Sequence, residues 1–166
     1  ETFTGKIREV TLGATKEQGG TRKRTVTVGG ETTLPFLHFE GEIPNPPAIA
    51  VEITDKFPAD WSPLLIQAWG EKVMSDPALW AAKAEETGAD IIMIRLTGLS
   101  SNDQPYPPQE AATIVQRVLE ATGLPLIVRG PGQPERDNEL LTAVADKTAG
   151  ERIALGLCED KTTAPS

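Results

Sequence analysis

The sequence contains a single cysteine, Cys158, and this scarcity limits its chemistry. One thiol cannot form an internal disulfide, and it cannot hold an iron–sulfur cluster, which needs about four cysteine ligands. Histidine is as scarce, because His38 is the only one. The residues therefore include no His/Cys metal cluster and no Ser-His-Asp arrangement. We expect no iron–sulfur cluster, no metal site and no catalytic residues in this chain.

Positive charge and long apolar runs are also lacking. The chain has 16 Lys and Arg against 24 Asp and Glu, which gives a net charge of −8. An acidic surface repels phosphate backbones, so nucleic acid is not an expected partner. No run approaches the roughly 20 apolar residues that a membrane span needs, and the N-terminus shows no secretion pattern. We expect a cytoplasmic protein without a membrane partner.

Four short apolar runs, each but the last followed by a helix-like segment, are the clearest feature that is present. Such runs, separated by amphipathic helices, indicate parallel strands covered on both faces. A closed barrel of eight such units needs roughly 250 residues, so four units amount to about half of one. We predict an α/β fold in which residues 48–166 form a partial TIM barrel whose open edge other protein must cover. The four runs are residues 48–53, 90–96, 125–129 and 152–157.

Helix start and stop signals lie between these runs. We expect Asp60 to cap a helix whose apolar stripe, Trp61, Leu64, Leu65, Ala68 and Trp69, faces the core. The helical spacing of the tryptophans favours core packing over a stacking platform for a ligand. Three further helices are expected to begin at Asp76-Pro77, Pro107-Pro108 and Pro134 and to end at Gly88, Gly123 and Gly150.

Two segments before the first unit alternate polar and apolar residues with a period of two. They are residues 6–12 and 24–28, and they predict a β-hairpin within residues 1–30 that closes one end of the barrel. Residues 31–47 are rich in proline, which predicts an extended linker. The hairpin's expected buried face consists of Val10, Leu12, Val26 and Val28.

Polar residues follow the second and third apolar runs. Arg95 and Thr97 stand at the end of the second run and Arg129 at the end of the third. Carboxyl ends of parallel strands are where barrels place their functional groups, so a binding role is one interpretation. The other is structural: Glu52 is a charge within an apolar run, and Arg95 or Arg129 would be its partner.

Three more features each have a structural and a functional interpretation. The loop 130–135 enters a helix, where anions often bind, but its prolines remove two amide donors and Glu135 and Asp137 add negative charge, which favours a capped turn. Cys158 is a buried small residue or a reactive thiol. His38, between aromatic residues, is a packing residue or a ligand.

Several longer motifs carry a resemblance to a known family. They are Leu12-Gly13-Ala14-Thr15-Lys16-Glu17-Gln18-Gly19-Gly20-Thr21-Arg22, Val28-Gly29-Gly30-Glu31, Leu34-Pro35-Phe36 and His38-Phe39-Glu40-Gly41-Glu42-Ile43. Together they closely resemble the small subunit of the corrinoid iron–sulfur protein, which is the delta subunit of acetyl-CoA decarbonylase/synthase. The likeness continues through residues 88–90, 124–128, 150–151 and 155–156 and covers about residues 10–160.

The resemblance implies a (β/α)₈ barrel with an N-terminal hairpin, about twice this length, of which this chain holds the hairpin and roughly the first four units. It also implies a non-catalytic subunit that pairs with a large (gamma) subunit carrying the iron–sulfur cluster and a cobalamin domain. The shared corrinoid would take a methyl group from a methyltetrahydropterin methyltransferase and pass it to acetyl-CoA synthase in the reductive acetyl-CoA (Wood–Ljungdahl) pathway. Arg95, Thr97, Arg129 and Gly156 are the residues we expect to face the corrinoid.

An enzyme is the alternative interpretation. Pterin-dependent methyltransferases have a similar barrel and hold the pterin with Asp and Asn side chains at strand ends. The acids that follow strands here are Asp55, Asp103, Glu159 and Asp160, and all are expected in loops. A third interpretation is a degenerate segment without a ligand.

Overall fold

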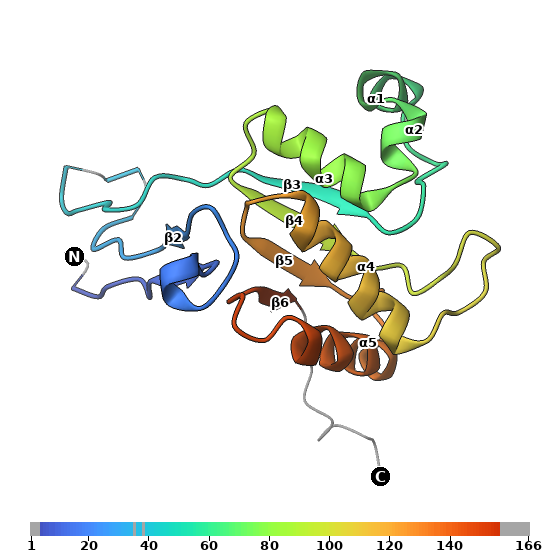
Figure 1. The fold of residues 1–166 in the computed structure, drawn as a ribbon. Coiled ribbons are helices and arrows are strands. Elements are labelled where there is room, and N and C mark those ends of the chain that lie inside the picture. The colour runs from blue at the N-terminus through green and yellow to red at the C-terminus, as the bar shows by residue number, and fades with distance from the viewer. Residues whose placement is uncertain (1–3, 35, 38, 157–166) are drawn as a thin grey trace, which may run out of the picture.

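The structure is a computed structural model that describes residues 4–34, 36–37 and 39–156 (Figure 1). Two sheets make up its β-structure: a two-stranded hairpin and a four-stranded sheet. The interpretations that concern His38 and Cys158 lie outside the described residues. No helix in the described part of the chain is long and apolar enough to cross a membrane.

The four-stranded sheet is parallel and contains the four apolar runs. Its strands pair in the order β3-β4-β5-β6, so each strand lies beside its neighbour in sequence. This confirms four parallel strands, each at its expected place in the chain. The strands are β3 (Ala50–Thr54), β4 (Ile91–Arg95), β5 (Leu126–Arg129) and β6 (Ala154–Gly156).

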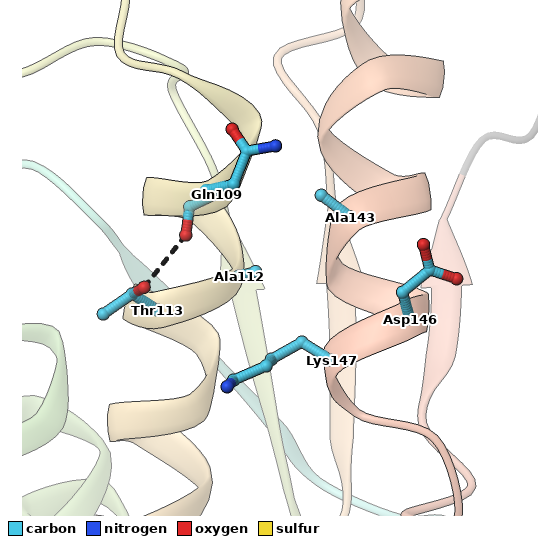
Figure 2. A pocket seen from close by; sticks show the side chains of 6 residues that line it. All are labelled: Gln109, Ala112, Thr113, Ala143, Asp146 and Lys147. Atoms are coloured by element: carbon cyan, nitrogen blue, oxygen red, sulfur yellow. Dashed lines mark hydrogen bonds between the residues drawn. The ribbon is translucent and has the colours of Figure 1, made fainter.

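Five α-helices connect these strands: α1 (Pro63–Trp69), α2 (Glu71–Met74), α3 (Pro77–Glu86), α4 (Pro108–Ala121) and α5 (Pro134–Lys147). The prolines that were expected to begin α3, α4 and α5 do so, because proline fits the first turn, where its missing N–H is not needed. Asp76 caps α3 by accepting a hydrogen bond from the N–H of Ala78 at 2.9 Å. Between α4 and α5 runs an open groove of about 400 Å³ (Figure 2).

The prediction for α1 was wrong in two respects. Ser62, not Asp60, is the cap, and its hydroxyl accepts from the N–H of Leu64 at 3.4 Å. Leu64 and Leu65, expected in the core, are 75% and 46% exposed. Apolar residues surround most of this short helix, so periodicity alone does not define one buried face. Packing of the large Trp69 side chain against the core decides which face turns inward.

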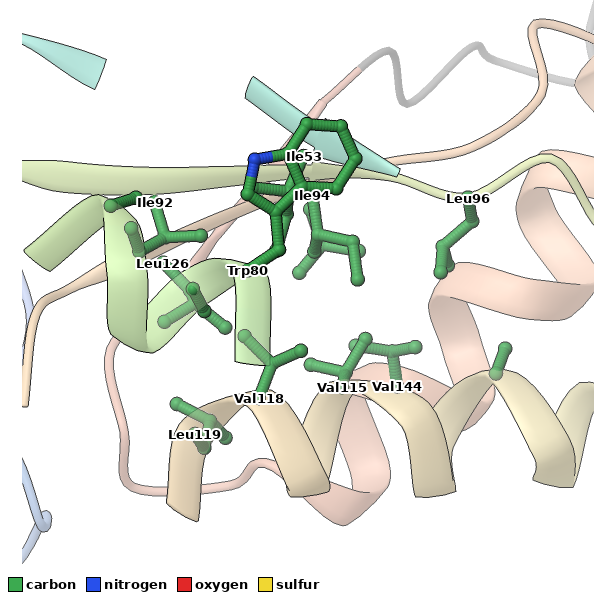
Figure 3. Close-up of a cluster of buried hydrophobic side chains, with 14 of the residues drawn as sticks. Ile53, Trp80, Ile92, Ile94, Leu96, Val115, Val118, Leu119, Leu126 and Val144 are labelled. Carbon is green, nitrogen blue, oxygen red and sulfur yellow. The ribbon is translucent and has the colours of Figure 1, made fainter. Parts of the chain in front are cut away.

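The hydrophobic core lies between the sheet and the layer formed by α3, α4 and α5 (Figure 3). Alternate strand residues point into it, among them Ile53, Ile94 and Val128, all fully buried. Trp80 of α3 is also fully buried, and Trp61 and Trp69 meet its ring edge-to-face at centroid distances of 5.4 and 6.1 Å. The expectation that the tryptophans pack in the core is confirmed.

Helices cover only one face of the parallel sheet among the described residues, whereas the sequence predicted both faces covered. Right-handed connections between strands that follow one another in order place every helix on the same side. The other face, called the open face below, carries the remaining alternate residues, and they are charged, small and apolar. They are Ala50, Glu52, Thr54, Ile91, Met93, Arg95, Ile127, Arg129, Ala154 and Gly156.

The expected hairpin is present as β1 (Val10–Leu12) and β2 (Val26–Val28), with the short 3₁₀ helix η1 (Lys16–Gln18) in its connection. Val10 pairs with Val28 and Leu12 with Val26. Leu12 is buried, but Val10 is 45% exposed, so the four apolar residues do not form one uniformly buried face. The described residues of the linker 31–47 contain no helix or strand.

The hairpin connection lies across the amino ends of the parallel strands, on the left in Figure 1. The N–H of Gly13 donates to the carbonyl of Arg152 at 2.8 Å, and the N–H of Lys23 donates to the carbonyl of Gly123 at 2.9 Å. Gly123 lies three residues before the start of β5, and Arg152 lies two residues before the start of β6. The polar groups of the open face near the carboxyl ends are therefore left uncovered by the hairpin.

Candidate functional site

The carboxyl ends of the parallel strands bring three of the expected site residues into one row. Arg95 of β4 pairs in register with Arg129 of β5, and Arg129 pairs with Gly156 of β6. Thr54 of β3 continues the row on the other side of Arg95. Paired residues of neighbouring strands project from the same face, so the row lies on the open face. We call these three residues, Arg95, Arg129 and Gly156, the arginine row.

Arg95 has the partner that the structural interpretation required. Its Nε lies 3.2 Å from Oε1 of Glu52, and the two side chains are 40% and 32% exposed. The pair leaves the terminal nitrogens of the Arg95 guanidinium available on the open face. Glu52 thus stabilises Arg95 and orients it at the same time.

The side chain of Arg129 makes no hydrogen bond or ion pair with any described residue, although its backbone carbonyl accepts from the N–H of Leu96 at 2.8 Å, and the residue is partly buried. Its aliphatic stem lies over Gly156: a Cβ on Gly156 would come within 2.8 Å of the Arg129 Cγ. Any larger residue at this position would therefore displace the arginine. Glycine at this position leaves room for the stem of Arg129 beside the end of β6.

Thr97 is not part of the row. Its N–H donates to both carboxylate oxygens of Asp55, at 2.8 and 3.0 Å, and its Oγ1 contacts the backbone of Leu99. These contacts shape the loop that follows β4. The structure places Thr97 as a loop-forming residue beside the arginine row.

Asp55 and Tyr106 anchor that loop, and sequence reasoning did not assign them this role. The Tyr106 hydroxyl donates to the Asp55 carboxylate, and Tyr106 is only 4% exposed. Burial raises the pKa of the Tyr106 hydroxyl, and the adjacent Asp55 charge raises it further, so it remains a proton donor to Asp55. An acid directly after a strand and the only tyrosine of the chain were the available signals.

The loop after β5 resolves one open alternative. Its free amides are already used, because the buried Asp137 carboxylate accepts from the N–H of Gly132 at 3.0 Å and of Gln133 at 3.1 Å. A bound anion would have to compete with a carboxylate for these donors. The loop is the capped turn that the prolines and acids favoured.

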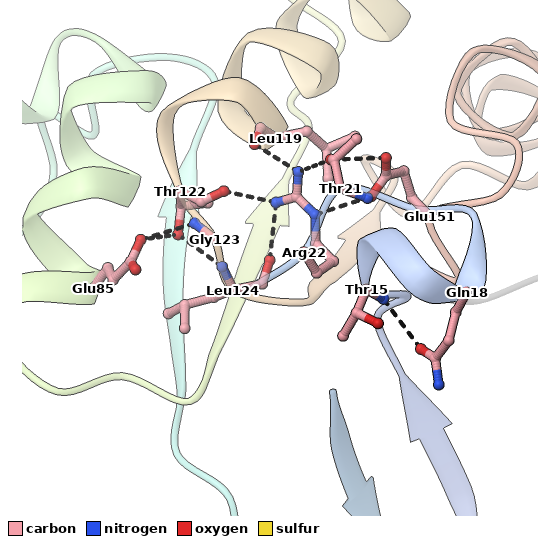
Figure 4. Close-up of polar contacts among 10 residues, drawn as sticks. All are labelled: Thr15, Gln18, Thr21, Arg22, Glu85, Leu119, Thr122, Gly123, Leu124 and Glu151. Atoms are coloured by element: carbon pink, nitrogen blue, oxygen red, sulfur yellow. Dashed lines mark hydrogen bonds and ion pairs between the residues drawn. The ribbon is translucent and has the colours of Figure 1, made fainter. Parts of the chain in front are cut away.

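Arg22, at the opposite end of the sheet, is a second feature that the sequence did not indicate (Figure 4). Its side chain is 2% exposed, and its Nε lies 2.9 Å from Oε2 of Glu151. The terminal nitrogens donate to the carbonyls of Leu119, Thr122 and Leu124 at 2.7, 2.7 and 3.2 Å. The hairpin is thereby attached to the C-terminal end of α4, whose carbonyls need donors. This network is structural.

The groove between α4 and α5 carries no comparable chemistry. It lies on the outer surface of the helix layer, and its charged groups are Asp146 and Lys147 (Figure 2). Within the described ranges, no three His, Cys, Asp or Glu side chains are arranged to hold a metal ion. The arginine row is therefore the candidate site.

A parallel sheet with consecutive strand order and with its described helices on one side defines an α/β protein. The family is given by comparison with known proteins. The chain belongs to the CO dehydrogenase/acetyl-CoA synthase delta subunit family, whose model matches residues 9–161.

Relatives in archaea support this assignment. The acetyl-CoA decarbonylase/synthase complex subunit delta of Archaeoglobus fulgidus is 41% identical over 93% of this chain, and that of Methanocaldococcus jannaschii is 36% identical over 93%. Subunit delta 1 from Methanosarcina thermophila is 35% identical over 92%. The matched segments are 34%, 38% and 35% of these relatives, so the chain spans about a third of their length.

Proposed function

We propose that this chain is a non-catalytic, corrinoid-binding and scaffolding part of the delta subunit in an acetyl-CoA decarbonylase/synthase complex. Its partners would be the large (gamma) corrinoid/iron–sulfur subunit, a methyltetrahydropterin methyltransferase and acetyl-CoA synthase. The observation that carries the proposal is the arginine row on an open sheet face, in a chain of this family.

The proposed architecture is the first part of a (β/α)₈ barrel. Consecutive parallel strands with all helices on one side are the arrangement of barrel units, and the open face would then be the barrel interior. The hairpin covers the amino ends, so the carboxyl ends would form the functional mouth. A corrinoid would lie over that mouth, between this subunit and the large subunit.

The residues present fit such a ligand. A corrinoid is edged with amide side chains, which accept hydrogen bonds, and Arg129 is a partly buried donor without a partner among the described residues. Arg95 adds further donors, and Gly156, which has no side chain, leaves space beside Arg129. When bound, the corrinoid supplies the cobalt that carries the methyl group. The chain's own residues would bind its periphery and exclude water from one side.

The alternative, a pterin-dependent methyltransferase, has less support from these side chains. Asp55 already accepts from the Thr97 N–H and the Tyr106 hydroxyl, and Asp103 is paired with Lys56. A pterin would need a free carboxylate or amide at the strand ends. Tight pterin binding by the purified protein without any partner would favour this alternative.

Reconstitution tests the proposal. The natural protein that contains this sequence is mixed with the large subunit loaded with cobalamin, and the cobalt is reduced. We expect a stable heterodimer in which reoxidation of the reduced corrinoid, followed by absorbance, is slower than on the large subunit alone. An unchanged reoxidation rate in a confirmed heterodimer would contradict the proposed role.

A further inference from the structure

The arginine row combines two like charges at neighbouring positions, which a sheet does not need for its own stability. Arg95 and Arg129 are partners in register on strands about 4.8 Å apart. Like charges at adjacent positions are destabilising. Glu52 forms an ion pair with Arg95 and neutralises its positive charge, so the positive charge of Arg129 remains.

The charge on Arg129 is unusual for this chain. Arg22, Arg24, Arg95, Arg117 and Arg136 each have an acidic partner. Arg8 and Arg152 have no acidic partner within the part of the chain that the structure describes, but both are exposed, and water solvates them. Only Arg129 combines partial burial with the lack of a partner among the described residues, although the chain has 24 acidic residues. Its guanidinium therefore has donors that no described residue uses, on a side chain whose stem lies over Gly156.

We propose that Arg95 and Arg129 together bind a phosphate-class oxyanion on the open face of the sheet. The planar guanidinium donates two parallel hydrogen bonds to such a group, and the single positive charge that remains after Glu52 neutralises Arg95 matches the single negative charge of a phosphodiester. Glu52 orients Arg95, and Gly156 is a positioning residue because it leaves room for the stem of Arg129. This inference deepens the proposed function and rests on it for the larger ligand: the oxyanion would be the phosphodiester of a corrinoid nucleotide loop.

Titration of the natural protein with inorganic phosphate, followed by calorimetry, is the first test. Binding is expected to be saturable and to fall by at least ~10-fold in Arg129→Gln, because a charge-assisted pair is lost. Arg8→Gln removes the same charge from an exposed, unpartnered arginine and should change affinity less than twofold. Arg129→Lys keeps the positive charge but loses the two parallel donors of the guanidinium. Its affinity for phosphate should therefore lie between those of Arg129→Gln and Arg8→Gln.

Stability gives an independent readout. Without phosphate, Arg129→Gln should melt about 1–4 °C higher than the parent protein, since the like-charge contact is relieved. Phosphate should raise the melting temperature of the parent protein and not of this variant. Gly156→Ala should weaken phosphate binding without removing any charge, because its Cβ displaces the Arg129 stem. Absence of saturable phosphate binding, or an equal loss in Arg8→Gln, would overturn the inference.

A second comparison separates this inference from the proposed function. Hydroxocobalamin contains the nucleotide-loop phosphate, whereas cobinamide lacks it. The heterodimer should bind hydroxocobalamin more tightly than cobinamide, and Arg129→Gln should remove that preference. Phosphate binding through Arg129 without any corrinoid binding would refute the proposed function and support a site for free phosphate. Corrinoid binding that is equal in the parent protein and Arg129→Gln would refute the phosphodiester contact alone.

Discussion

Arg22 shows how a single residue can connect two parts of the fold. Its Nε and terminal nitrogens make five hydrogen bonds, to Thr21, Leu119, Thr122, Leu124 and Glu151. A buried guanidinium is costly unless all its donors are used, and here each N–H has an acceptor. The residue therefore stabilises both the hairpin connection and the end of α4.

Replacing Arg22 with methionine should lower the free energy of unfolding by about 3–5 kcal/mol, because Glu151 and the α4 carbonyls lose their donor. Urea denaturation measures this change. Arg24→Met is the matched control: the Arg24–Asp90 pair is 50% and 33% exposed, and its loss should cost less than about 1 kcal/mol. Equal effects of the two substitutions would mean that the Arg22 network adds nothing.

Glu85 predicts a dependence of stability on pH. Burial raises the pKa of its carboxyl, but hydrogen bonds from Lys23, Thr122 and the Gly123 N–H outweigh burial and lower the pKa from 4.5 to about 2. Because the folded pKa lies below the unfolded one, the stabilisation is complete above about pH 5 and is lost as pH falls toward 2.

Glu85→Gln should therefore cost about 1–3 kcal/mol at neutral pH and almost nothing near pH 2. Urea denaturation of both proteins across this pH range measures the difference. Glu86→Gln is a suitable control, since Glu86 is 67% exposed in its pair with Lys83. A pH-independent cost of Glu85→Gln would contradict the assignment.

Among the elements, the loop between β4 and α4 depends on one carboxylate. Asp55 accepts from the Thr97 N–H and from the Tyr106 hydroxyl, and so holds both ends of this loop. The loop borders the arginine row, and its conformation limits what can approach Arg95.

Asp55→Asn should increase hydrogen exchange of the Thr97 amide by about 10-fold or more, because hydrogen bonds to a charged acceptor contribute about 1.5–3 kcal/mol. Exchange measured by mass spectrometry on peptides from residues 96–107 would show it. Asp103→Asn, in the same loop but 74% exposed, should leave the exchange at Thr97 unchanged. If the Thr97 amide stayed protected from exchange in Asp55→Asn, contacts other than those of Asp55 would order the loop.

At the scale of the whole molecule, the open face and the strand edges determine behaviour in solution. The outer edge of β3 has no strand partner among the described residues, and Ile49 beside it is 63% exposed. Unpaired strand edges with apolar neighbours tend to associate.

We expect the isolated chain to show a concentration-dependent mass in size-exclusion chromatography with light scattering. Ile49→Lys should reduce this association, because a lysine at an edge disfavours strand pairing. Leu64→Lys changes a residue that is 75% exposed on α1, away from the edge, and should have a smaller effect. A monodisperse, cooperatively melting monomer at micromolar concentration would contradict this expectation.

Local signals predicted most of the elements. Proline at a helix start fixes the backbone locally, so α3, α4 and α5 begin where expected. The buried faces of α4 and α5, with Val115 and Leu140, also follow a local pattern, because one face of each helix is apolar. In α1, by contrast, the leucines and Trp69 are all apolar, and local periodicity does not indicate which of them is buried in the core.

The candidate site, too, was predictable from the sequence only in part. Its arginines were predictable because they directly follow apolar runs, and strand ends converge at one edge. The shared row, the lack of a partner for the Arg129 side chain among the described residues and the stem lying on Gly156 depend on register between strands more than 25 residues apart in sequence. Arg22 was missed because four of its five acceptors are 97 to 129 residues away in sequence.

The sequence by itself determined the number, order and direction of the parallel strands, since apolar runs and helix caps act through neighbouring residues. It also determined that the chain is acidic and has a single thiol. Only the tertiary structure decided that the described helices share one side of the sheet, that Arg22 attaches the hairpin and that the Arg129 side chain has no partner among the described residues. These depend on contacts between distant segments, whose energies are fixed by packing and register and not by any local pattern.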